Sequence, residues 1–347
     1  MAWKEDEGAI LLDPSILSEG YHPKSISGRE TQVSRLRSCL SPVLRNEKPI
    51  HAWLYGRPGT GKTATARFLS QEIYDKSRVA SVHVNCRMYN SFFSILDFIL
   101  NELRAGFGNE RDARVKLEKL GRYARDRPLL IILDEIDFLP WKERSNLLYN
   151  LSFGKIGLVC ISEGREALLS LNGRTRSRLQ PQLIEFPDYS QEETAAILRE
   201  RASMSLSPDS WSEQTLKEIA QLAEGDARAA IQTLRGTAEL AHTQTAEKID
   251  PDHIKEAFGG IRGFMKSYTL KRLGEHSKML YDFIEGSEGM LSSRLWELYR
   301  EECGNKGLEP IAKRTYSHYL NTMARLKLIK AERARVRGRV YLFSVRE

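Results

Sequence analysis

The sequence predicts an α/β fold, with a parallel sheet first, helices alone after it, and a small domain of helices and a hairpin at the C-terminal end. Short apolar runs alternate with helical patterns as far as Pro187. Two of these runs, residues 129–133 and 156–161, are uninterrupted, which is typical of strands buried on both faces of a parallel sheet. Strands that alternate with helices favour parallel pairing through crossover connections.

Further elements of the predicted sheet domain surround a glycine-rich loop. Residues 50–55 are predicted to form a short strand that runs into glycine, and residues 62–76 the helix after it. Residues 79–85 alternate like a strand, and apolar side chains at helical spacing predict a helix over residues 91–104. The loop is therefore expected between a strand and the helix that follows it.

After Pro187 the pattern becomes helical throughout, up to residue 260. Ser190 and Glu193 form a capping box at the start of a helix. Asp250 and Pro251 mark another helix start, with a cap followed by proline in the first turn. Three glycines then predict a hinge: Gly259, Gly260 and Gly263.

The C-terminal part combines three predicted helices with a hairpin. The helices lie near residues 270–285, 292–303 and 312–327, and two short strands flank Arg337 and Gly338. This order matches a winged helix-turn-helix. We therefore predict three domains, an α/β core, a helical lid and a winged helix, over residues 1–189, 190–264 and 265–347.

The composition is that of a globular protein, with 41% hydrophobic and 29% charged residues. No stretch approaches the roughly 18 apolar residues that span a bilayer, and the acidic N-terminus lacks the layout of a signal peptide. We therefore expect a cytoplasmic protein with no membrane partner. The four cysteines lie far apart and form no C-x-x-C pair, so we expect buried thiols: Cys39, Cys86, Cys160 and Cys303.

The net charge of +7 is concentrated at the C-terminal end. Residues 271–347 hold 16 Lys and Arg against 10 Asp and Glu, which leaves +6 there and about +1 over the other 270 residues. A basic block this local indicates a module that binds a polyanion. A solvated surface is the alternative.

The loop of residues 56–63 satisfies the pattern G-x-x-x-x-G-K-[ST]. Its glycines let backbone N–H groups turn inward around phosphate oxygens, and the following helix adds the positive end of its dipole. Lys62 is expected to reach the β- and γ-phosphates of ATP or ADP, and the hydroxyl of Thr63 to ligate Mg²⁺. The predicted nucleotide-binding residues of the loop are Gly56, Pro58, Gly59, Thr60, Gly61, Lys62 and Thr63.

Two carboxylates at the end of the apolar run 129–133 complete this predicted site. Asp134 can hold Mg²⁺, so Thr63 and Asp134 are the predicted metal residues. Glu135 can orient the attacking water and is a predicted catalytic residue together with Lys62. Asp137 is either a nearby second acid or a solvated residue at a helix start, with the latter slightly favoured.

The helix after Pro310 has a core side and a polar side. Tyr316, Tyr319, Leu320, Met323 and Leu326 recur at core spacing. On the other side, arginine and asparagine can read base edges in a major groove. The predicted residues on that side that contact double-stranded DNA are Lys313, Arg314, Ser317 and His318, with Asn321 one turn further on. The wing is predicted to add Arg333, Arg335, Arg337 and Arg339, for phosphates or a narrowed minor groove. A solvated hairpin is the alternative.

With these motifs, the sequence resembles the archaeal origin-recognition initiators, AAA+ ATPases related to the eukaryotic origin recognition complex and its cell-division-cycle loading partner. The resemblance covers nearly the whole chain. Tyr21-His22-Pro23 and Gly28-Arg29-Glu30 resemble the family's entry segment, and the phosphate loop is close to the family's own. Asn85-Cys86-Arg87 and the helix after it resemble an initiator-specific insertion that touches DNA.

The resemblance implies roles for further residues. Tyr21 and Pro23 would line the adenine pocket, unless they only pack against a strand edge. Arg228, in Gly-Asp-Ala-Arg, resembles the sensor-2 arginine that reaches the γ-phosphate, although it could be an ordinary surface arginine. The segment from Arg174 to Tyr189 resembles the arginine-finger box, in which Arg178 is favoured over Arg174 and a plain basic loop is the alternative.

The implied task is that of a replication initiator, which binds origin DNA, uses ATP and ADP as a switch with weak hydrolysis, and helps to load a replicative helicase. Paralogous initiator subunits are possible partners, and a location on the nucleoid follows. One departure from the family is Glu163, which stands where the family commonly has a sensor-1 asparagine, and this puts efficient hydrolysis in doubt. The alternatives are a clamp-loader-like or helicase-loader ATPase, and a transcriptional or signalling ATPase.

Overall fold

The structure is a computed structural model that describes residues 10–104, 112–260, 274–325, 328–334 and 341–345. It forms two compact units, Met1–Ala257 and Phe258–Glu347, which are described separately. Gly263 of the predicted hinge, Leu326 of the predicted core stripe, and Arg335, Arg337 and Arg339 of the predicted wing lie outside the described residues.

The first unit contains a five-stranded sheet in the order β2-β3-β4-β1-β5. All strand pairs in it are parallel, which confirms the predicted parallel α/β core. The strands are β1 (Ala52–Tyr55), β2 (Ala80–Asn85), β3 (Leu129–Asp134), β4 (Ile156–Ser162) and β5 (Gln182–Glu185). The short strand β5 was not anticipated from the sequence. Because the strands run in one direction, their carboxyl ends meet at one edge, where Asn85 pairs in register with Asp134.

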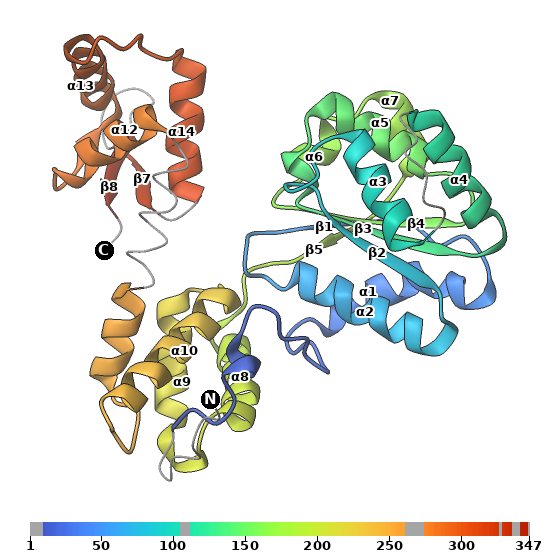
Figure 1. Ribbon diagram of the computed structural model, residues 1–347. Helices are drawn as coiled ribbons and strands as arrows, with labels where there is room; N and C mark the ends of the chain where they lie inside the picture. The colour runs from blue at the N-terminus through green and yellow to red at the C-terminus, as the bar shows by residue number, and fades with distance from the viewer. Residues whose placement is uncertain (1–9, 105–111, 261–273, 326–327, 335–340, 346–347) are drawn as a thin grey trace. The chain divides into compact units, whose positions relative to one another are not determined.

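Helices cover both faces of this sheet (Figure 1). One face carries α1 (Glu30–Leu40) and α2 (Lys62–Ser77), with the 3₁₀ turn η2 (Ser41–Arg45) between α1 and β1. The other face carries a larger set: α3 (Phe92–Glu102), α4 (Ala113–Asp126), α5 (Trp141–Leu151), α6 (Glu166–Leu169) and α7 (Gly173–Leu179), with the turn η3 (Ile136–Phe138).

Burial on both faces explains the uninterrupted apolar runs. In β3, Leu129, Ile131 and Leu133 belong to one apolar cluster, and Leu130 and Ile132 belong to the cluster on the opposite face. Every residue of β3 and β4 is buried. A central parallel strand therefore has no polar side, as the sequence predicts.

The lid consists of helices around a third apolar cluster. Its helices are α8 (Gln191–Ser205), α9 (Glu213–Ala223), α10 (Ala227–Thr243) and residues 251–260, with the turn η4 (Pro208–Ser210). The predicted capping box is confirmed, because Ser190 and Glu193 each accept a hydrogen bond from the other's backbone N–H. The first described residues also pack here: Ile10 and Leu17, the latter in the turn η1 (Pro14–Leu17), are buried in the lid cluster.

The second unit has the predicted three helices with one more strand than expected. Its elements in order are α12 (Glu275–Glu285), β6 (Met290–Leu291), α13 (Ser292–Asn305), α14 (Lys313–Arg325), β7 (Ile329–Arg333) and β8 (Tyr341–Val345). The sheet is antiparallel in the order β6-β8-β7. This arrangement agrees with a winged helix-turn-helix. Of the predicted core stripe, Tyr316, Leu320 and Met323 are buried and Tyr319 packs against them.

Two further predictions concern thiols and membranes. All four cysteines are free and buried, which confirms the prediction of buried thiols. Over the described residues, no helix is long and apolar enough to cross a membrane.

Candidate nucleotide-binding site

The phosphate loop connects the carboxyl end of β1 to the first turn of α2, as predicted. Gly61 is the N-cap of α2 with φ of 90°, and Gly59 has φ of 77°. A Cβ at Gly59 would collide with the carboxylate of Asp226 from the lid, and a Cβ at Gly61 would collide with the hydroxyl of Tyr189. These glycines therefore serve both the backbone turn and the close approach of the lid.

Lys62 is buried at the centre of the loop. Its Nζ donates hydrogen bonds to the carbonyls of Gly56 (2.6 Å) and Arg57 (2.7 Å). Burial lowers the pKa of Lys62 to about 8, and the negative charges of Asp134 and Glu163 oppose that shift. The positive charge of Arg228 acts in the same direction as burial. The predicted lysine therefore lies within electrostatic reach of the other predicted site residues.

Thr63 and Asp134 are brought into direct contact. The hydroxyl of Thr63 donates to Oδ2 of Asp134 (2.8 Å), and the backbone N–H of Glu135 donates to Oδ1 (3.0 Å). Burial opposes the charged carboxylate, but hydrogen bonds from His83 and Thr63 outweigh it, so the pKa of Asp134 lies below its ordinary value. An adjacent hydroxyl and carboxylate are hard oxygen donors that fit Mg²⁺.

The described residues include no group of three or more His, Cys, Asp or Glu side chains that could hold a metal by themselves. Mg²⁺ is commonly bound through one or two protein groups together with substrate phosphates. Thr63 and Asp134 are such a pair.

Glu135 follows Asp134 in a left-handed conformation, with φ of 53°. Its Oε2 is buried and has no hydrogen-bond partner in the structure. Burial raises the pKa of Glu135, while the charge of Arg87 and a hydrogen bond from Asn85 oppose the shift. A carboxylate oxygen that is free to accept is suited to orienting a water molecule.

Glu163 and Asp137 meet beside the loop. The backbone N–H of Glu163 donates to Oδ2 of Asp137 (3.3 Å), and its carbonyl accepts from the N–H of Gly56 (3.2 Å). Glu163 therefore lies beside the phosphate loop, and its predicted place at sensor 1 stays a prediction. Asp137 is half-buried, lies in the first turn of η3 and accepts this one bond, so both interpretations of it, as a second acid and as a residue at a helix start, stay predictions.

Arg29 and Tyr189 link the loop to the start of the lid, which the sequence did not reveal. Arg29 is 1% exposed, and it donates to the carbonyls of Thr60 (2.9 Å) and Pro187 (2.5 Å). Its guanidinium lies 3.5 Å from the centroid of the Tyr189 ring. The sequence contains the Gly-Arg-Glu triplet and the segment that ends at Tyr189 as separate motifs, but neither pattern indicates that the two side chains meet.

The lid reaches the loop through the first turn of α10. The N–H of Ala227 donates to the carbonyl of Gly59 (3.2 Å), and Asp226 caps the helix through Arg228 N and Ala229 N. Arg228 is exposed in this turn. The structure therefore places the predicted sensor-2 arginine at the phosphate loop.

Tyr21 and Pro23 are less closely tied to the loop. The ring of Tyr21 lies 4.0 Å from the guanidinium of Arg201, and its hydroxyl lies 3.7 Å from the sulfur of Met204, both on α8. Pro23 is half-buried. The contacts of Tyr21 are therefore with the lid, and its predicted role in the adenine pocket stays a prediction.

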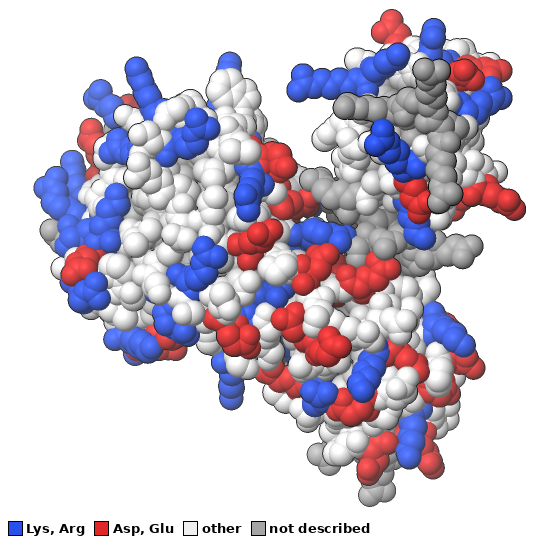
Figure 2. Space-filling view, turned by 180° about the vertical axis from the view of Figure 1, so that it is seen from behind, with Lys and Arg blue, Asp and Glu red and all other residues white. Residues whose placement is uncertain are grey.

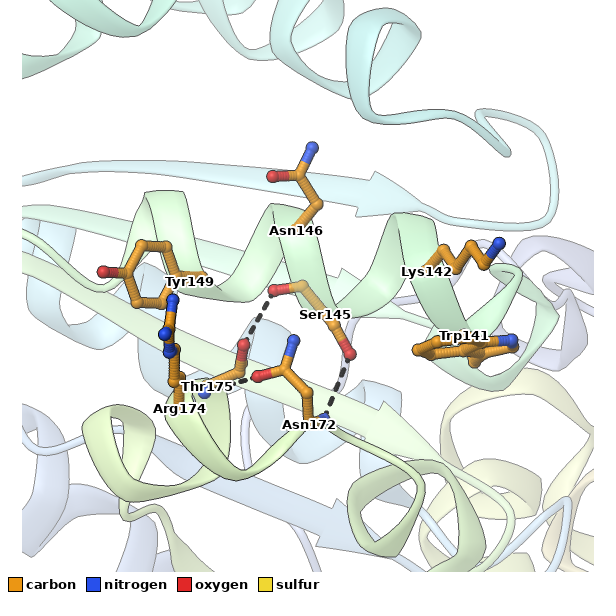
Figure 3. A pocket seen from close by; sticks show the side chains of 8 residues that line it. All are labelled: Trp141, Lys142, Ser145, Asn146, Tyr149, Asn172, Arg174 and Thr175. Carbon is orange, nitrogen blue, oxygen red and sulfur yellow. Dashed lines mark hydrogen bonds between the residues drawn. The ribbon is translucent and has the colours of Figure 1, made fainter.

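The two arginine-finger candidates differ in their surroundings. Arg178 is half-buried with its guanidinium 3.3 Å from the ring centroid of Phe153 and 4.9 Å from that of Tyr149. Arg174 is exposed and lines a pocket of about 330 Å³ between α5 and α7. Figure 3 shows Arg174 and Tyr149 at one end of this pocket and Trp141 at the other.

The predicted DNA-contacting residues of the helix after Pro310 share one exposed surface of α14. The exposed residues are Lys313, Arg314, Ser317, His318 and Asn321, and Arg333 is exposed on β7. Figure 2 shows positive and negative side chains intermixed over the lid on the face in view, so the charge pattern there does not mark a polyanion site. The exposed helix in the second unit is the better candidate.

Comparisons with known proteins agree with these motifs. Residues 47–164 match the AAA domain, and residues 195–259 match the Cdc6 AAA+ ATPase-type lid domain. An ORC1-type DNA replication protein from Pyrococcus abyssi is 29% identical over 93% of this chain and 84% of its own length.

Solved structures resemble the chain over nearly its whole length. The Aeropyrum pernix ORC1 protein, solved in complex with DNA, has a TM-score of 0.75 and 26% identity over 97% of this chain and 94% of its own. Cdc6p from Pyrobaculum aerophilum has a TM-score of 0.68 and 25% identity over the same shares. The likeness extends over the core, the lid and the C-terminal unit alike, so the chain is similar over nearly its whole length to archaeal ORC1- and Cdc6-type AAA+ replication proteins.

Proposed function

We propose that this protein is a replication initiator that binds origin duplex DNA and helps to load the replicative helicase, with ATP and ADP as its switch. The observation that carries the proposal is the direct bonding of the phosphate loop to the lid. The N–H of Ala227 in the lid donates to the carbonyl of Gly59, and Arg29 of the core joins the carbonyl of Thr60 to that of Pro187 just before the lid. A nucleotide that binds this loop contacts a segment that is already attached to the lid, so its phosphates can change the lid's orientation.

The nucleotide would be held by the loop, with Lys62 and Arg228 at its phosphates and Mg²⁺ at Thr63 and Asp134. The metal would supply positive charge to the phosphate oxygens. Glu135 would orient the water, and Glu163, an acid beside the loop, would keep turnover slow. Names of relatives such as the ORC1-type DNA replication protein, and the DNA in the solved ORC1 complex, support the assignment to replication.

For the arginine finger we now favour Arg174 over Arg178. The guanidinium of Arg178 is engaged by two aromatic rings of its own chain, whereas that of Arg174 is exposed. An arginine that acts on nucleotide in a neighbouring subunit must be free to leave its own chain. Paralogous initiator subunits are the proposed neighbours.

DNA would be held by α14 in the major groove, with the wing on the backbone. The residues assigned to it are Lys313, Arg314, Ser317, His318 and Arg333, together with Arg335, Arg337 and Arg339. The insertion-like segment around Asn85-Cys86-Arg87 and α3 would add a second contact.

The test is a salt titration of the full-length protein, with ATP or ADP, against origin-derived and random duplexes. Each phosphate contact gives a log–log slope of about −0.9, so Arg333→Ala should reduce the slope by about one unit on all sequences. Arg314→Ala should instead reduce the preference for origin DNA. The matched control is Lys217→Ala, which removes an exposed charge from α9 of the lid.

Absence of DNA binding at about 50 mM salt would contradict the DNA assignment. A genome-wide map of the sites that the protein occupies would instead favour a transcriptional ATPase if it shows promoters and no enrichment at origins. Vigorous hydrolysis stimulated by DNA would favour a clamp-loader-like or helicase-loader enzyme.

A further inference from the structure

His83 lies beside the candidate magnesium residues, although no motif includes it. It is on β2, the strand at the edge of the sheet, and its neighbours Val82 and Val84 point into the cluster on the α3 face. Because successive side chains of a strand alternate, His83 points to the opposite face, towards α2. There Nε2 of His83 lies 3.0 Å from Oδ2 of Asp134.

The second ring nitrogen of His83 is held by α2 itself. Arg67 donates a hydrogen bond from Nε to Nδ1 of His83 (2.8 Å). Arg67 is one helical turn after Thr63, so both side chains lie on the same side of α2. One face of α2 therefore supports Asp134 in two ways: Thr63 donates to it directly, and Arg67 holds the imidazole that contacts it.

The bond from Arg67 determines which nitrogen of His83 carries the proton. A guanidinium can only donate, so Nδ1 must accept. In the neutral ring the hydrogen is then on Nε2, which donates it to Asp134. Hydrogen bonds are thus donated in one direction, from Arg67 to His83 and from His83 to Asp134.

Asp134 is fixed by three donors, two of them from other elements. Oδ2 accepts from Thr63 of α2 and His83 of β2, and Oδ1 accepts from the N–H of Glu135. The side chain of Asp134 is 9% exposed and that of His83 is 20% exposed, so water competes little for these bonds. Without His83, Oδ2 would keep only the hydroxyl of Thr63, which rotates freely.

We propose that His83 is a positioning residue that orients the carboxylate of Asp134 for Mg²⁺, and that Arg67 holds His83 in the required tautomer. The inference rests on the proposed function, in which Asp134 helps to bind Mg²⁺ with the nucleotide. Partners that orient a metal-binding group usually contribute a factor of about 10 to 100 in metal affinity.

The experiment measures the binding of a fluorescent ATP analogue as Mg²⁺ is titrated, and again in EDTA. His83→Leu should need roughly 10-fold or more Mg²⁺ to reach half of the metal-dependent gain in affinity. Its affinity in EDTA should stay within about twofold of the wild type, because no phosphate contact changes. His83→Gln retains both an acceptor and a donor on one amide and should restore most of the wild-type response.

Arg67→Met should shift the Mg²⁺ midpoint in the same direction by a smaller factor, since Nδ1–H then becomes available and Nε2 loses its hydrogen part of the time. The matched control is Lys76→Met, which also removes a positive charge from α2. Lys76 pairs with Glu72 and not with His83. That variant should titrate like the wild type.

The outcomes separate this inference from the proposed function. A wild-type protein that fails to bind the analogue, or binds it without any effect of Mg²⁺, would overturn the proposed nucleotide site itself. If His83→Leu has the same Mg²⁺ midpoint as the wild type, the positioning role of His83 is overturned. If His83→Leu does not fold, the Arg67→Met variant tests the proposal instead, because Arg67 is exposed. An Mg²⁺ midpoint of Arg67→Met equal to that of the wild type would also overturn the positioning role of His83.

Discussion

Glu163 places a carboxylate near the phosphate loop, and its negative charge raises the pKa of Lys62, against the effect of burial. We predict that Glu163→Asn raises the rate of ATP hydrolysis by roughly 10-fold, because an amide donor near developing negative charge stabilises the transition state that a carboxylate repels. Single-turnover hydrolysis measures the effect. Glu163→Gln, with the same charge change and a longer side chain, is the control, and a slower Glu163→Asn would mean that the carboxylate itself assists the reaction.

His51 shows how burial of a single side chain makes stability depend on pH. Its Nδ1 accepts from the N–H of Leu158 (3.1 Å), and its Nε2 is buried without a partner. Burial, with help from the charge of Lys48, lowers the pKa of His51 to about 4. The unfolded chain therefore takes up a proton near pH 6.5 and the folded chain only near pH 4, so stability is complete above pH 6.5 and is lost as the pH falls towards 4.

We predict that His51→Asn removes this loss. The Oδ1 of asparagine can still accept from Leu158, but the side chain does not titrate. The drop in the free energy of unfolding between pH 7 and pH 4 should become smaller by about 3 kcal/mol. Urea denaturation followed by circular dichroism at both pH values measures it, and an equal drop in the two proteins would show that His51 does not cause the dependence.

At the scale of elements, the junction between the sheet and the lid depends on Arg29. It bonds the carbonyl of Thr60 in the loop and that of Pro187 before α8, and it stacks on Tyr189. The junction therefore joins the start of α2 to the start of the lid through one buried side chain.

We predict that Arg29→Lys weakens this junction although it keeps the charge. An ammonium lacks the planar fork that reaches both carbonyls, and each buried acceptor left unpaired costs about 1–3 kcal/mol. Nucleotide affinity should fall and proteolysis between residues 187 and 190 should accelerate. Arg35→Lys is a control, since Arg35 on α1 is exposed and bonds only the carbonyl of Leu183 among its described hydrogen bonds. An unchanged cleavage rate would show that the junction does not need Arg29.

At the scale of the whole molecule, the arginine-finger assignment predicts dependence on assembly. Arg174→Ala should lower hydrolysis only at protein concentrations at which subunits associate, since the arginine acts on a neighbour. Arg178→Ala should instead lower the melting temperature, because it removes a cation–π contact worth about 0.5–2 kcal/mol. Hydrolysis measured against protein concentration distinguishes the two, and a loss by Arg174→Ala that is equal at all concentrations would contradict action on a neighbour.

The sequence by itself determined the phosphate loop, the Asp134-Glu135 pair and the buried central strands. These features are local, because a turn around phosphate, a strand buried on both faces and a helix cap each need particular residues within a few positions. The resemblance of the motifs to a known family extended the prediction to Arg228, which the structure places in the first turn of α10 at the loop.

Only the tertiary structure decided which distant side chains complete the site. Arg29 meets Pro187 across 158 positions, and His83 meets Asp134 across 51, and no spacing within the sequence encodes either contact. Strand β6 is another feature that the sequence did not predict. It is only two residues long and forms because β8 pairs with it. Arg178 had the more typical local context for a finger, yet the rings of Tyr149 and Phe153 engage it, because helix packing, and not local pattern, sets which charges stay exposed.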